Sequence, residues 1–505
     1  MDWKDTVRKT TRTFYWFLFG LFFLSYAYFF QGGGWNQNTR ICLTRSIIDY
    51  GTFAIDHVKE DSPEMEFVNT GDWAYYDGHY YSNKSPGLSF LAVPFFATSQ
   101  MLLAYLIPDN PERQMLFSAY ASTLCTVVLL SACLCLLIFY VFHRMVGLSV
   151  NAALLLALLF GFGTLAFSYS TTFYCHQPAA CCSFLAFVLV MRIRYGASSK
   201  KHMMAVLSGF SAASAVVIEP SAVIMLAGVA VYLASMREGR KYILFFMLGC
   251  LPPGAVLGWY NYVCFGHPLA SSYHYSNDMV MWKVQGKLFG FPNLKRFYQL
   301  LISPYRGLFF TSPVLVMALP GFFIALKKKW VREALLCVLL SAVFILFIAC
   351  FHAWHGGSAA GPRYLLPVFP FLYFLAGFSL MRFRRLFLLI GSVSLLINLS
   401  ITIVGNEIPR DIRNPLVTVV AKNLLEGKVS INPVPFSHFE RYDIYKLAKI
   451  ENWNSMVNHN SFNLGELLFP HSLLSLLPLL CFWFVWGWWW KRLMNLKNHG
   501  EHRKR

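Results

Sequence analysis

Residues 71–87 read GDWAYYDGHYYSNKSPG, and the apolar run LSFLAVPFFA follows at 88–97. Two aspartates, a histidine, a lysine and four tyrosines thus stand directly before a segment that could lie in a membrane. The whole chain explains the setting, because 56% of its 505 residues are hydrophobic and only 13% are charged. Several further apolar runs are long enough to cross a bilayer. The pattern predicts an all-α polytopic membrane protein whose few reactive side chains gather in loops at the membrane surface.

The net charge of +19 is spread over short basic clusters between the apolar runs. Because positive residues mark the cytoplasmic ends of helices, we interpret the charge as a topology signal, with a minor share in attracting membrane lipid. Nucleic acid is not an expected partner. The clusters lie at 4–12, 143–144, 192–202, 237–241, 327–332, 382–385 and 491–505. Both termini are therefore expected in the cytoplasm.

Between successive basic clusters the chain must cross the membrane an even number of times, which predicts about 12 spanning helices. These are expected near 14–30, 115–141, 149–168, 178–194, 203–218, 221–236, 242–262, 305–326, 333–351, 364–381, 386–404 and 469–490. On this count all of 31–114 lies outside. The apolar segment 88–107 is then expected to be a juxtamembrane or re-entrant helix. The stretch 14–30 has no cleavage site after it and should remain as the first span.

This topology divides the chain into three parts. Residues 1–404 form a transmembrane module that carries the first outer loop, 31–114. Residues 405–468 form another outer loop, too long for a simple connection, which caps the site or binds an acceptor. Residues 469–505 form the last span and a basic cytoplasmic tail.

Motifs for soluble cofactor-binding domains are not found in the sequence. It has no P-loop, no GxGxxG turn after a strand and no GxSxG elbow. The 12 cysteines include no CxxC pair or zinc-type spacing. Four histidines of the outer loops can be acid–base groups, metal ligands or hydrogen-bonding loop residues: His79, His176, His267 and His355. No cofactor is predicted, and a divalent metal is compatible with the sequence but not indicated by it.

Two cations of the outer loops are candidates for binding phosphate. Lys84 precedes a Ser-Pro-Gly turn, where it can hold a lipid head group or anchor the chain at the interface. Arg363 follows the glycines of HAWHGGSAAGPRY (352–364), and a guanidinium can hold phosphate through two parallel hydrogen bonds. Because the topology places Arg363 outside, where a plain helix-end arginine is not expected, we favour ligand binding for it.

Arg40 and Glu219 each have a structural and a functional interpretation. Arg40 begins a predicted helix near the membrane surface and can pair with Asp49, Asp56 or a substrate phosphate. Glu219 stands between two apolar segments, at a depth where an acid is costly and usually functional or paired. The adjacent Pro220 also suits a plain hairpin turn.

Taken together, these loops resemble a known family. NQNTR at 36–40, GDW at 71–73, Lys-x-Pro at 84–86 and W-x-GG…GPRYL-x-P at 354–367 are similar to motifs of the GT-C superfamily of lipid-linked-sugar glycosyltransferases. The chain looks most similar to bacterial proteins of the protein-mannosyltransferase and lipid A aminoarabinose-transferase type. The likeness covers nearly the full length and includes FGHPL, SPYRGLFFTSPVL and NLGEL.

The resemblance implies transfer of a sugar from a polyprenyl-phosphate donor, with inversion at the anomeric carbon. The acceptor would be an envelope lipid, glycan or protein at the outer face of the bacterial cytoplasmic (inner) membrane. In the family, the lysine of Lys-x-Pro contacts the donor phosphate, and this role carries over to Lys84. The residues expected to bind substrate are Lys84, Arg363, Arg40, Arg306, His355, Asn38, Asn83 and Glu219.

The family's acidic residue does not carry over directly. Relatives have an acid at the start of the first outer loop, whereas this chain has amides at 36–38 and Asn83 before the lysine. An amide can orient a hydroxyl but cannot accept its proton near neutral pH. Either Asp72, Asp77 or Asp56 supplies the base, or the acceptor needs little deprotonation, or the protein only binds lipid. Asp77 also begins Asp-Gly, a frequent turn dipeptide.

Three classes of function remain. A glycosyltransferase can work without a strong base, since stabilising the leaving phosphate is usually the larger contribution to rate. A lipid-linked-sugar transporter or flippase would also have about 12 helices, but it often shows internal repeats and polar midplane helices, which are not evident here. A non-catalytic membrane protein is the third class. We favour the transferase, with Asp72 or Asp77 orienting the acceptor.

Overall fold

The computed structural model describes residues 3–61, 70–196, 199–276, 289–431 and 461–502. Helices make up most of these residues, and two small sheets of two strands each complete the fold. The predicted outer loop 405–468 is described at its two ends, because residues 432–460 lie outside these ranges.

The helices and strands alternate with short connections along the chain. The helices are α1 (Trp3–Ala27), α2 (Trp35–Asp49), α3 (Asp56–Asp61), α4 (Gly87–Leu106), α5 (Pro111–Thr123), α6 (Leu129–Tyr140), α7 (Val150–Gly163), α8 (Ala166–Tyr169), α9 (His176–Tyr195), α10 (Lys201–Ile218), α11 (Val223–Ala234), α12 (Ile243–Phe265), α14 (Leu294–Leu301), α15 (Leu308–Thr311), α16 (Ala318–Leu326), α17 (Val331–Cys350), α18 (Phe369–Ser379), α19 (Arg384–Val404), α20 (Lys422–Leu425) and α22 (Leu477–His502). The strands are β1 (Phe29–Gln31), β2 (Trp73–Tyr76), β3 (His79–Ser82) and β4 (Ser461–Asn463).

Eight helices in the described residues are long and apolar enough to cross a membrane, judged by length and composition. They are Gly87–Leu106, Pro111–Met145, His176–Tyr195, Lys201–Ile218, Gly239–Phe265, Val331–Cys350, Arg384–Val404 and Leu473–Met494. Shorter apolar helices are Thr13–Ala27, Val150–Gly163, Pro220–Ala234, Pro313–Leu326, Arg363–Ser379 and Leu416–Leu425. Apart from Gly87–Leu106 and Leu416–Leu425, these helices match the predicted spans one to one. The predicted all-α polytopic membrane fold is confirmed.

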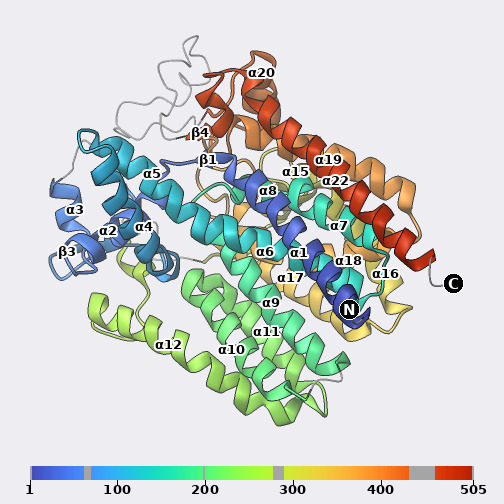
Figure 1. Ribbon diagram of the computed structural model, residues 1–505. Coiled ribbons are helices and arrows are strands. Elements are labelled where there is room, and N and C mark those ends of the chain that lie inside the picture. The colour runs from blue at the N-terminus through green and yellow to red at the C-terminus, as the bar shows by residue number, and fades with distance from the viewer. Residues whose placement is uncertain (1–2, 62–69, 197–198, 277–288, 432–460, 503–505) are drawn as a thin grey trace.

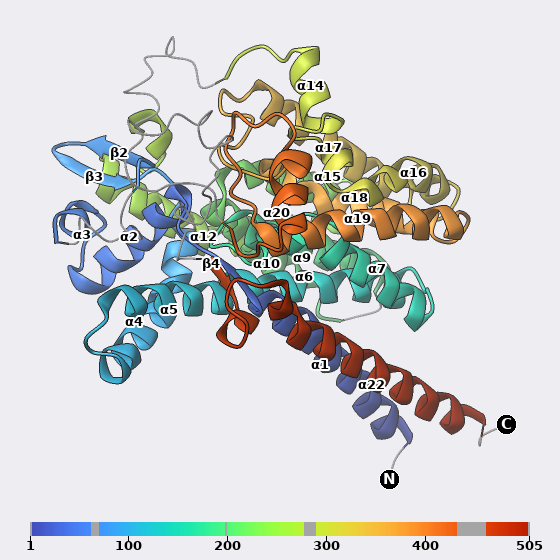
Figure 2. The ribbon, with the colours of Figure 1, turned by 90° about the horizontal axis from the view of Figure 1, so that it is seen from above.

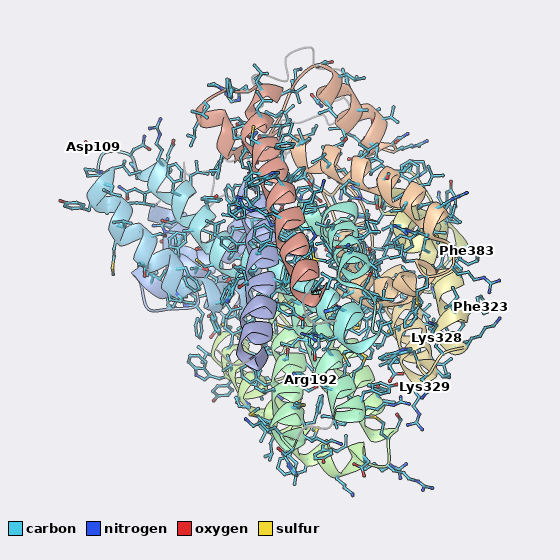
Figure 3. All side chains as sticks on the ribbon, turned by 45° about the vertical axis from the view of Figure 1, so that its right-hand side comes forward. Asp109, Arg192, Phe323, Lys328, Lys329 and Phe383 are labelled. Atoms are coloured by element: carbon cyan, nitrogen blue, oxygen red, sulfur yellow. The ribbon has the colours of Figure 1, made fainter. Side chains whose placement is uncertain are left out.

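The first and last helices lie side by side and run in opposite directions (Figures 1 and 2). The indole nitrogens of Trp483 and Trp486 donate to Ser25 Oγ and the Phe17 carbonyl at 2.8 and 3.1 Å. Both chain ends therefore lie at one end of the molecule, as an even number of crossings requires. Figure 3 places Asp109, between α4 and α5, on the opposite side from the basic residues Lys328 and Lys329.

Close helix packing depends on small residues where α10 crosses α12. A Cβ on Gly209 would overlap the Phe246 carbonyl, and one on Gly249 would overlap the Val206 carbonyl. Glycines let the two backbones approach closely, which is how helices associate when lipid surrounds them. α12 thereby attaches at the edge of the bundle in Figure 1.

Helix α4 packs against α5 at the end of the molecule that carries the first loop (Figure 2). α5 begins a continuous helix, Pro111–Met145, of 35 residues. At 1.5 Å per residue this helix is about 52 Å long, more than the roughly 30 Å of a bilayer core. Part of it must extend beyond the membrane, and α4 lies beside its first part. This arrangement is consistent with a juxtamembrane position of α4, as the sequence predicts.

Short strands organise the loops at the same end. β2 and β3 form an antiparallel hairpin, while β1 pairs with β4 and so joins the start of the first loop to the end of the 405–468 segment. Gln31 strengthens this junction, because its side chain donates to the Thr402 carbonyl and accepts from the Asn406 amide at 2.8 and 3.0 Å. The two outer loops predicted from the sequence are thus connected directly.

Candidate functional site

The β2–β3 hairpin brings Lys84 and Asp72 together. Trp73 pairs with Ser82 at the open end of the hairpin, so the residues just outside both strands are neighbours. Lys84 Nζ lies 3.1 Å from Asp72 Oδ2, and the side chains of Lys84 and Asp72 are 8% and 20% exposed. The ammonium also lies 5.8 Å from the centre of the Tyr273 ring. The lysine predicted to bind phosphate is thus buried beside an acid and an aromatic ring.

Contacts with helix α2 fix the position of Asp72. Thr70 Oγ1 donates to the Trp35 carbonyl at 2.9 Å and accepts from the Asp72 amide at 3.0 Å. Gly71 lies against the Trp35 ring, where a Cβ would not fit. The position of the carboxylate is therefore set by backbone contacts that do not depend on Lys84.

Asp77 forms the turn of the hairpin. Asp77 and Gly78 both have positive φ angles, 50° and 85°, which are the angles of a type I′ turn between strands. The Asp77 side chain is exposed at this tip. The geometry thus favours the turn-forming interpretation of the Asp-Gly pair over the catalytic one.

Arg363 is buried at the start of the 3₁₀ segment η8 (Arg363–Val368). Its guanidinium lies 4.5 Å from the Tyr174 ring centre and 5.5 Å from that of Tyr364. Its Nε and Nη1 have no hydrogen-bond partner among the described residues. The left-handed Gly356 packs against its side chain, where a Cβ would lie 3.2 Å away. A buried cation whose N–H groups have no acceptor lowers the stability of the folded protein unless an anion binds to it.

Arg306 and His355 form the scaffold around that arginine. The fully buried Arg306 guanidinium donates to the carbonyls of Tyr305, His355 and Gly357 at 3.0–3.2 Å. His355 Nδ1 accepts from the Gly357 amide at 2.9 Å. Burial and the charge of Arg306 lower the pKa of His355 to about 4, so this imidazole is neutral near pH 7. Both residues shape the glycine loop that holds Arg363.

Arg40 has protein partners for each of its nitrogens. It donates to Asn36 Oδ1 at 3.3 Å, to the Ser85 carbonyl at 3.1 Å and to Cys175 Sγ at 3.1 Å. The carboxylates that the sequence offered as its partners are engaged elsewhere. Asp49 pairs with Arg45 at 3.0 Å, and Asp56 with His79 at 3.1 Å. Arg40 therefore holds α2 against the Lys-x-Pro turn and the start of α9.

The two asparagines of the motifs are both buried. Asn38 lies within α2, fully enclosed. The Asn83 carbonyl accepts from Ser272 Oγ at 3.0 Å, while its side-chain Oδ1 has no partner in the described part of the chain. Asn83 Oδ1 is thus an acceptor that could bind a substrate hydroxyl.

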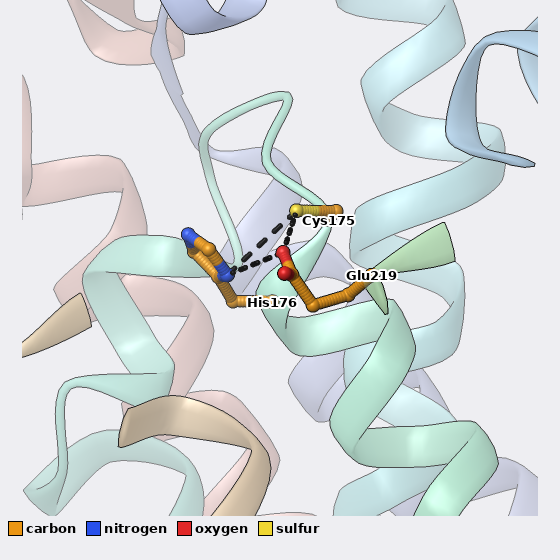
Figure 4. A group of neighbouring side chains, drawn as sticks. All are labelled: Cys175, His176 and Glu219. Atoms are coloured by element: carbon orange, nitrogen blue, oxygen red, sulfur yellow. Dashed lines mark hydrogen bonds and ion pairs between the residues drawn. The ribbon is translucent and has the colours of Figure 1, made fainter. Parts of the chain in front are cut away.

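Glu219 lies in a compact group with Cys175 and His176 (Figure 4). Glu219 Oε2 accepts from the Cys175 thiol at 2.8 Å and lies 3.3 Å from His176 Nδ1. Burial opposes ionisation of Glu219, but His176, the thiol and Arg40 outweigh it and lower its pKa to about 2. The ligand atoms of the three residues lie within 4.8 Å of one another, close enough to hold a metal ion. Glu219 thus does more than form a hairpin turn, because it contacts Cys175 and His176.

Glu407 is a site residue that the sequence interpretation missed. This buried carboxylate accepts a hydrogen bond from the Tyr174 hydroxyl and touches the backbone at Gly34, where a Cβ would lie 2.9 Å from it. Burial raises the pKa of Glu407, and the charge of Arg363 opposes the rise while that of Asp72 adds to it. Glu407 is therefore near both Arg363 and Asp72, the residue that pairs with Lys84.

We call Lys84, Asp72, Glu407 and Arg363 the site cluster. It comes from the first outer loop, the 352–364 loop and the start of the 405–468 loop. A signal for Glu407 did exist, since it follows a predicted span by three residues, at a depth where acids are usually functional or paired. The Cys–His–Glu group had no such signal, because Glu219 is more than 40 residues away from the adjacent Cys175 and His176.

No protein-family model and no curated protein sequence matches the chain. Two crystal structures of ArnT from Cupriavidus metallidurans align with it, one bound to undecaprenyl phosphate and the other in the apo state. Each has 13% identity, and the alignments cover 90% of this chain and 71% and 70% of theirs, with TM-scores of 0.48 and 0.47. This is a likeness in the path of the chain, and the function proposed below rests on the side chains of the site cluster.

Proposed function

We propose that the protein is a glycosyltransferase that moves a sugar from a polyprenyl-phosphate donor to an envelope lipid, glycan or protein acceptor at the outer face of a bacterial cytoplasmic membrane. The observation that carries the proposal is the buried Arg363, whose Nε and Nη1 have no hydrogen-bond partner among the described residues. Each of these N–H groups can donate a charge-assisted hydrogen bond to a phosphate oxygen. The ammonium of Lys84 adds a second charge to the same anion.

Helix α4 supports a lipid rather than a soluble phosphate as the ligand. It begins three residues after Lys84, and its side chains Leu91, Phe95, Met101 and Leu102 are exposed and apolar. A donor whose phosphate binds Lys84 would have its hydrocarbon chain next to this surface. The site therefore suits a head group that stays attached to a membrane lipid.

The reaction follows from charge stabilisation. The acceptor oxygen forms a bond to the anomeric carbon while the bond from that carbon to the phosphate oxygen breaks. The electron pair stays on the polyprenyl phosphate, whose added charge Arg363 and Lys84 stabilise. The acceptor proton passes to a carboxylate or to solvent.

Asp72 is the carboxylate best placed to receive that proton. It already forms an ion pair with Lys84, and its position is fixed by α2. When a phosphate binds Lys84, the Asp72 carboxylate is released from the ion pair and can orient an acceptor hydroxyl. The open Oδ1 of Asn83 can accept a hydrogen bond from a second hydroxyl of the substrate.

The test is transfer by purified protein in lipid nanodiscs. Radiolabelled polyprenyl-phosphate sugars are incubated with extracted envelope lipids, glycans and proteins, and label leaving the carrier is measured. We expect transfer by the wild type and by the exposed-lysine control Lys295→Ala, and loss with Lys84→Ala. If no donor is consumed while the lipid is bound, the glycosyltransferase proposal is wrong. Movement of the labelled carrier across vesicles would then identify a transporter.

A further inference from the structure

The group of Cys175, His176 and Glu219 offers one sulfur, one nitrogen and one oxygen ligand. Cys175 and His176 are almost fully buried, and the Glu219 side chain is 14% exposed. Cys175 and His176 stand at the start of α9, whereas Glu219 ends α10, so the packing of two helices creates the group (Figure 4). The proposed sugar transfer uses none of the three side chains.

The distances fit a transition metal. Around tetrahedral zinc, bonds of 2.0–2.3 Å place the ligand atoms roughly 3.3–3.6 Å apart. His176 Nδ1 lies 3.3 Å from Glu219 Oε2 and 3.7 Å from Cys175 Sγ. The distance between Cys175 Sγ and Glu219 Oε2 is shorter, 2.8 Å, because the thiol donates a hydrogen bond to the carboxylate. Release of that proton to solvent on metal binding allows this distance to lengthen.

The charges around the group are compatible with a dication. A thiolate and a carboxylate together neutralise two positive charges. Arg40 Nη2 donates to Cys175 Sγ at 3.1 Å, a contact that stabilises the thiolate from outside the ligand shell. Arg40 and Arg363 add positive charge near the thiol, which should reduce the affinity for a dication without changing the ligand set.

His176 directs its Nδ1 at the other two ligand atoms, the Cys175 sulfur and a Glu219 oxygen. A metal bound at Nδ1 would place the imidazole proton on Nε2, the nitrogen that donates a hydrogen bond outside the ligand shell in such sites. Nε2 is buried and has no hydrogen-bond partner in the described residues, so no contact there holds the proton on Nδ1.

We propose that Cys175, His176 and Glu219 bind a transition-metal dication of the zinc class, with at least one coordination position open to an external ligand. Mixed sulfur, nitrogen and oxygen ligands favour zinc over magnesium or calcium, which prefer oxygen alone. Three protein ligands leave a position free, as in zinc sites that bind water or substrate. This proposal stands independently of the sugar transfer proposed above.

The test is a Co²⁺ titration of purified protein without a histidine tag, after removal of metals with a chelator. Co²⁺ serves as a visible substitute for Zn²⁺. We expect one equivalent to bind, with intense visible bands of four-coordinate Co²⁺, a sulfur charge-transfer band, and displacement by Zn²⁺. Cys175→Ser and Glu219→Gln should each weaken binding by roughly 10-fold or more. The charge-transfer band should disappear in Cys175→Ser.

The control is Cys481→Ser, which removes an exposed thiol on α22 and should leave the titration unchanged. Cys175→Ser keeps a hydroxyl that can donate to Glu219, and its unfolding temperature without metal shows whether it folds. Wild-type protein that binds less than one equivalent, or a sulfur band that persists in Cys175→Ser, would overturn the proposal. The wild-type titration decides even if a variant does not fold.

Discussion

Two arginines near opposite ends of α9, one partly exposed and one buried, have different environments. Arg194, in the last turn, pairs with the fully buried Glu333 at 2.8 Å, and the hydroxyls of Tyr195 and Tyr232 donate to the same carboxylate. At the other end, His176 contacts the Tyr364 ring beside Arg363, whose Nε and Nη1 have no partner in the described structure. The two ends are about 27 Å apart, at 1.5 Å per residue.

The difference separates a structural charge from one kept for a ligand. The Arg194 charge is neutralised within the protein, so its loss should affect folding. The Arg363 charge is buried, and its Nε and Nη1 have no partner among the described residues, so its loss should affect binding of an external anion. Each prediction below tests one side of this contrast.

The largest effect is expected from Arg363→Ala. Two charge-assisted hydrogen bonds to the donor phosphate would be lost, which should reduce sugar transfer by roughly 100-fold or more. The unfolding temperature should change little, because Nε and Nη1 of Arg363 have no hydrogen bond to lose among the described residues. Transfer and thermal unfolding would be measured on the same preparation, with the exposed Arg384→Ala as control. A large loss of stability would mean that Arg363 is structural.

A smaller loss of transfer is expected from Lys84→Ala, roughly 10- to 100-fold, because one charged contact with phosphate disappears. Asp72→Asn should reduce transfer more at low pH than at high pH, because hydroxide in the solvent can take the acceptor proton at high pH.

A double-mutant cycle with Lys84→Ala and Asp72→Asn measures the coupling free energy between the two residues. Additive effects of the two substitutions would contradict a shared role at one phosphate.

Arg194→Ala should lower the stability of the protein and leave transfer unchanged, the opposite of Arg363→Ala. It leaves the buried Glu333 carboxylate without a counterion, at a cost of roughly 1–3 kcal/mol given the partial exposure of Arg194. Transfer per folded molecule should be unchanged. Thermal unfolding would be compared with that of Arg192→Ala, an exposed arginine on the same helix (Figure 3). Equal unfolding temperatures for the two variants would remove the contrast between the ends.

Glu407→Gln should change how donor binding depends on pH. Burial raises the pKa of Glu407, and its negative charge lies near Arg363. As the pH falls through that raised pKa, the acid becomes neutral and the donor phosphate should bind more tightly. Glutamine keeps an acceptor for the Tyr174 hydroxyl and should give tight, pH-independent binding. Titrations of polyprenyl phosphate at several pH values, with exposed Glu112→Gln as control, would measure this. An unchanged pH profile would exclude Glu407 from the site cluster.

At His355 the expected effect is on the pH dependence of stability alone. Its pKa of about 4 in the folded protein lies below the usual 6.5. Between these values the unfolded chain binds a proton that the folded chain does not, so stability should fall as the pH drops from 6.5 to 4, by at most about 3 kcal/mol. His355→Gln should flatten this part of the stability profile, whereas the exposed His267→Gln should not. Parallel profiles for wild type and His355→Gln would contradict the assignment.

The sequence predicted the helices well because hydropathy and basic clusters are local properties. It also predicted binding roles for Lys84 and Arg363, since each lies in a short motif beside an apolar segment, and these roles stay predictions. The partners of these residues depend on packing between distant segments, which one sequence does not record. Glu407 joins a site built mainly from the first loop, and Cys175 joins Glu219 across two helices. The turn at Asp77 could be predicted, because Asp-Gly is a frequent turn dipeptide and both residues have positive φ angles.

The central claim is that Nε and Nη1 of Arg363, which have no hydrogen-bond partner among the described residues, bind the phosphate of a lipid donor. The most direct measurement compares the affinities of nanodisc-embedded protein for undecaprenyl phosphate and for undecaprenol, which lacks the phosphate. The wild type and Arg194→Ala should bind the phosphate form at least roughly 10-fold more tightly. Arg363→Ala should bind both lipids equally. A preference for phosphate that survives in Arg363→Ala would contradict the claim.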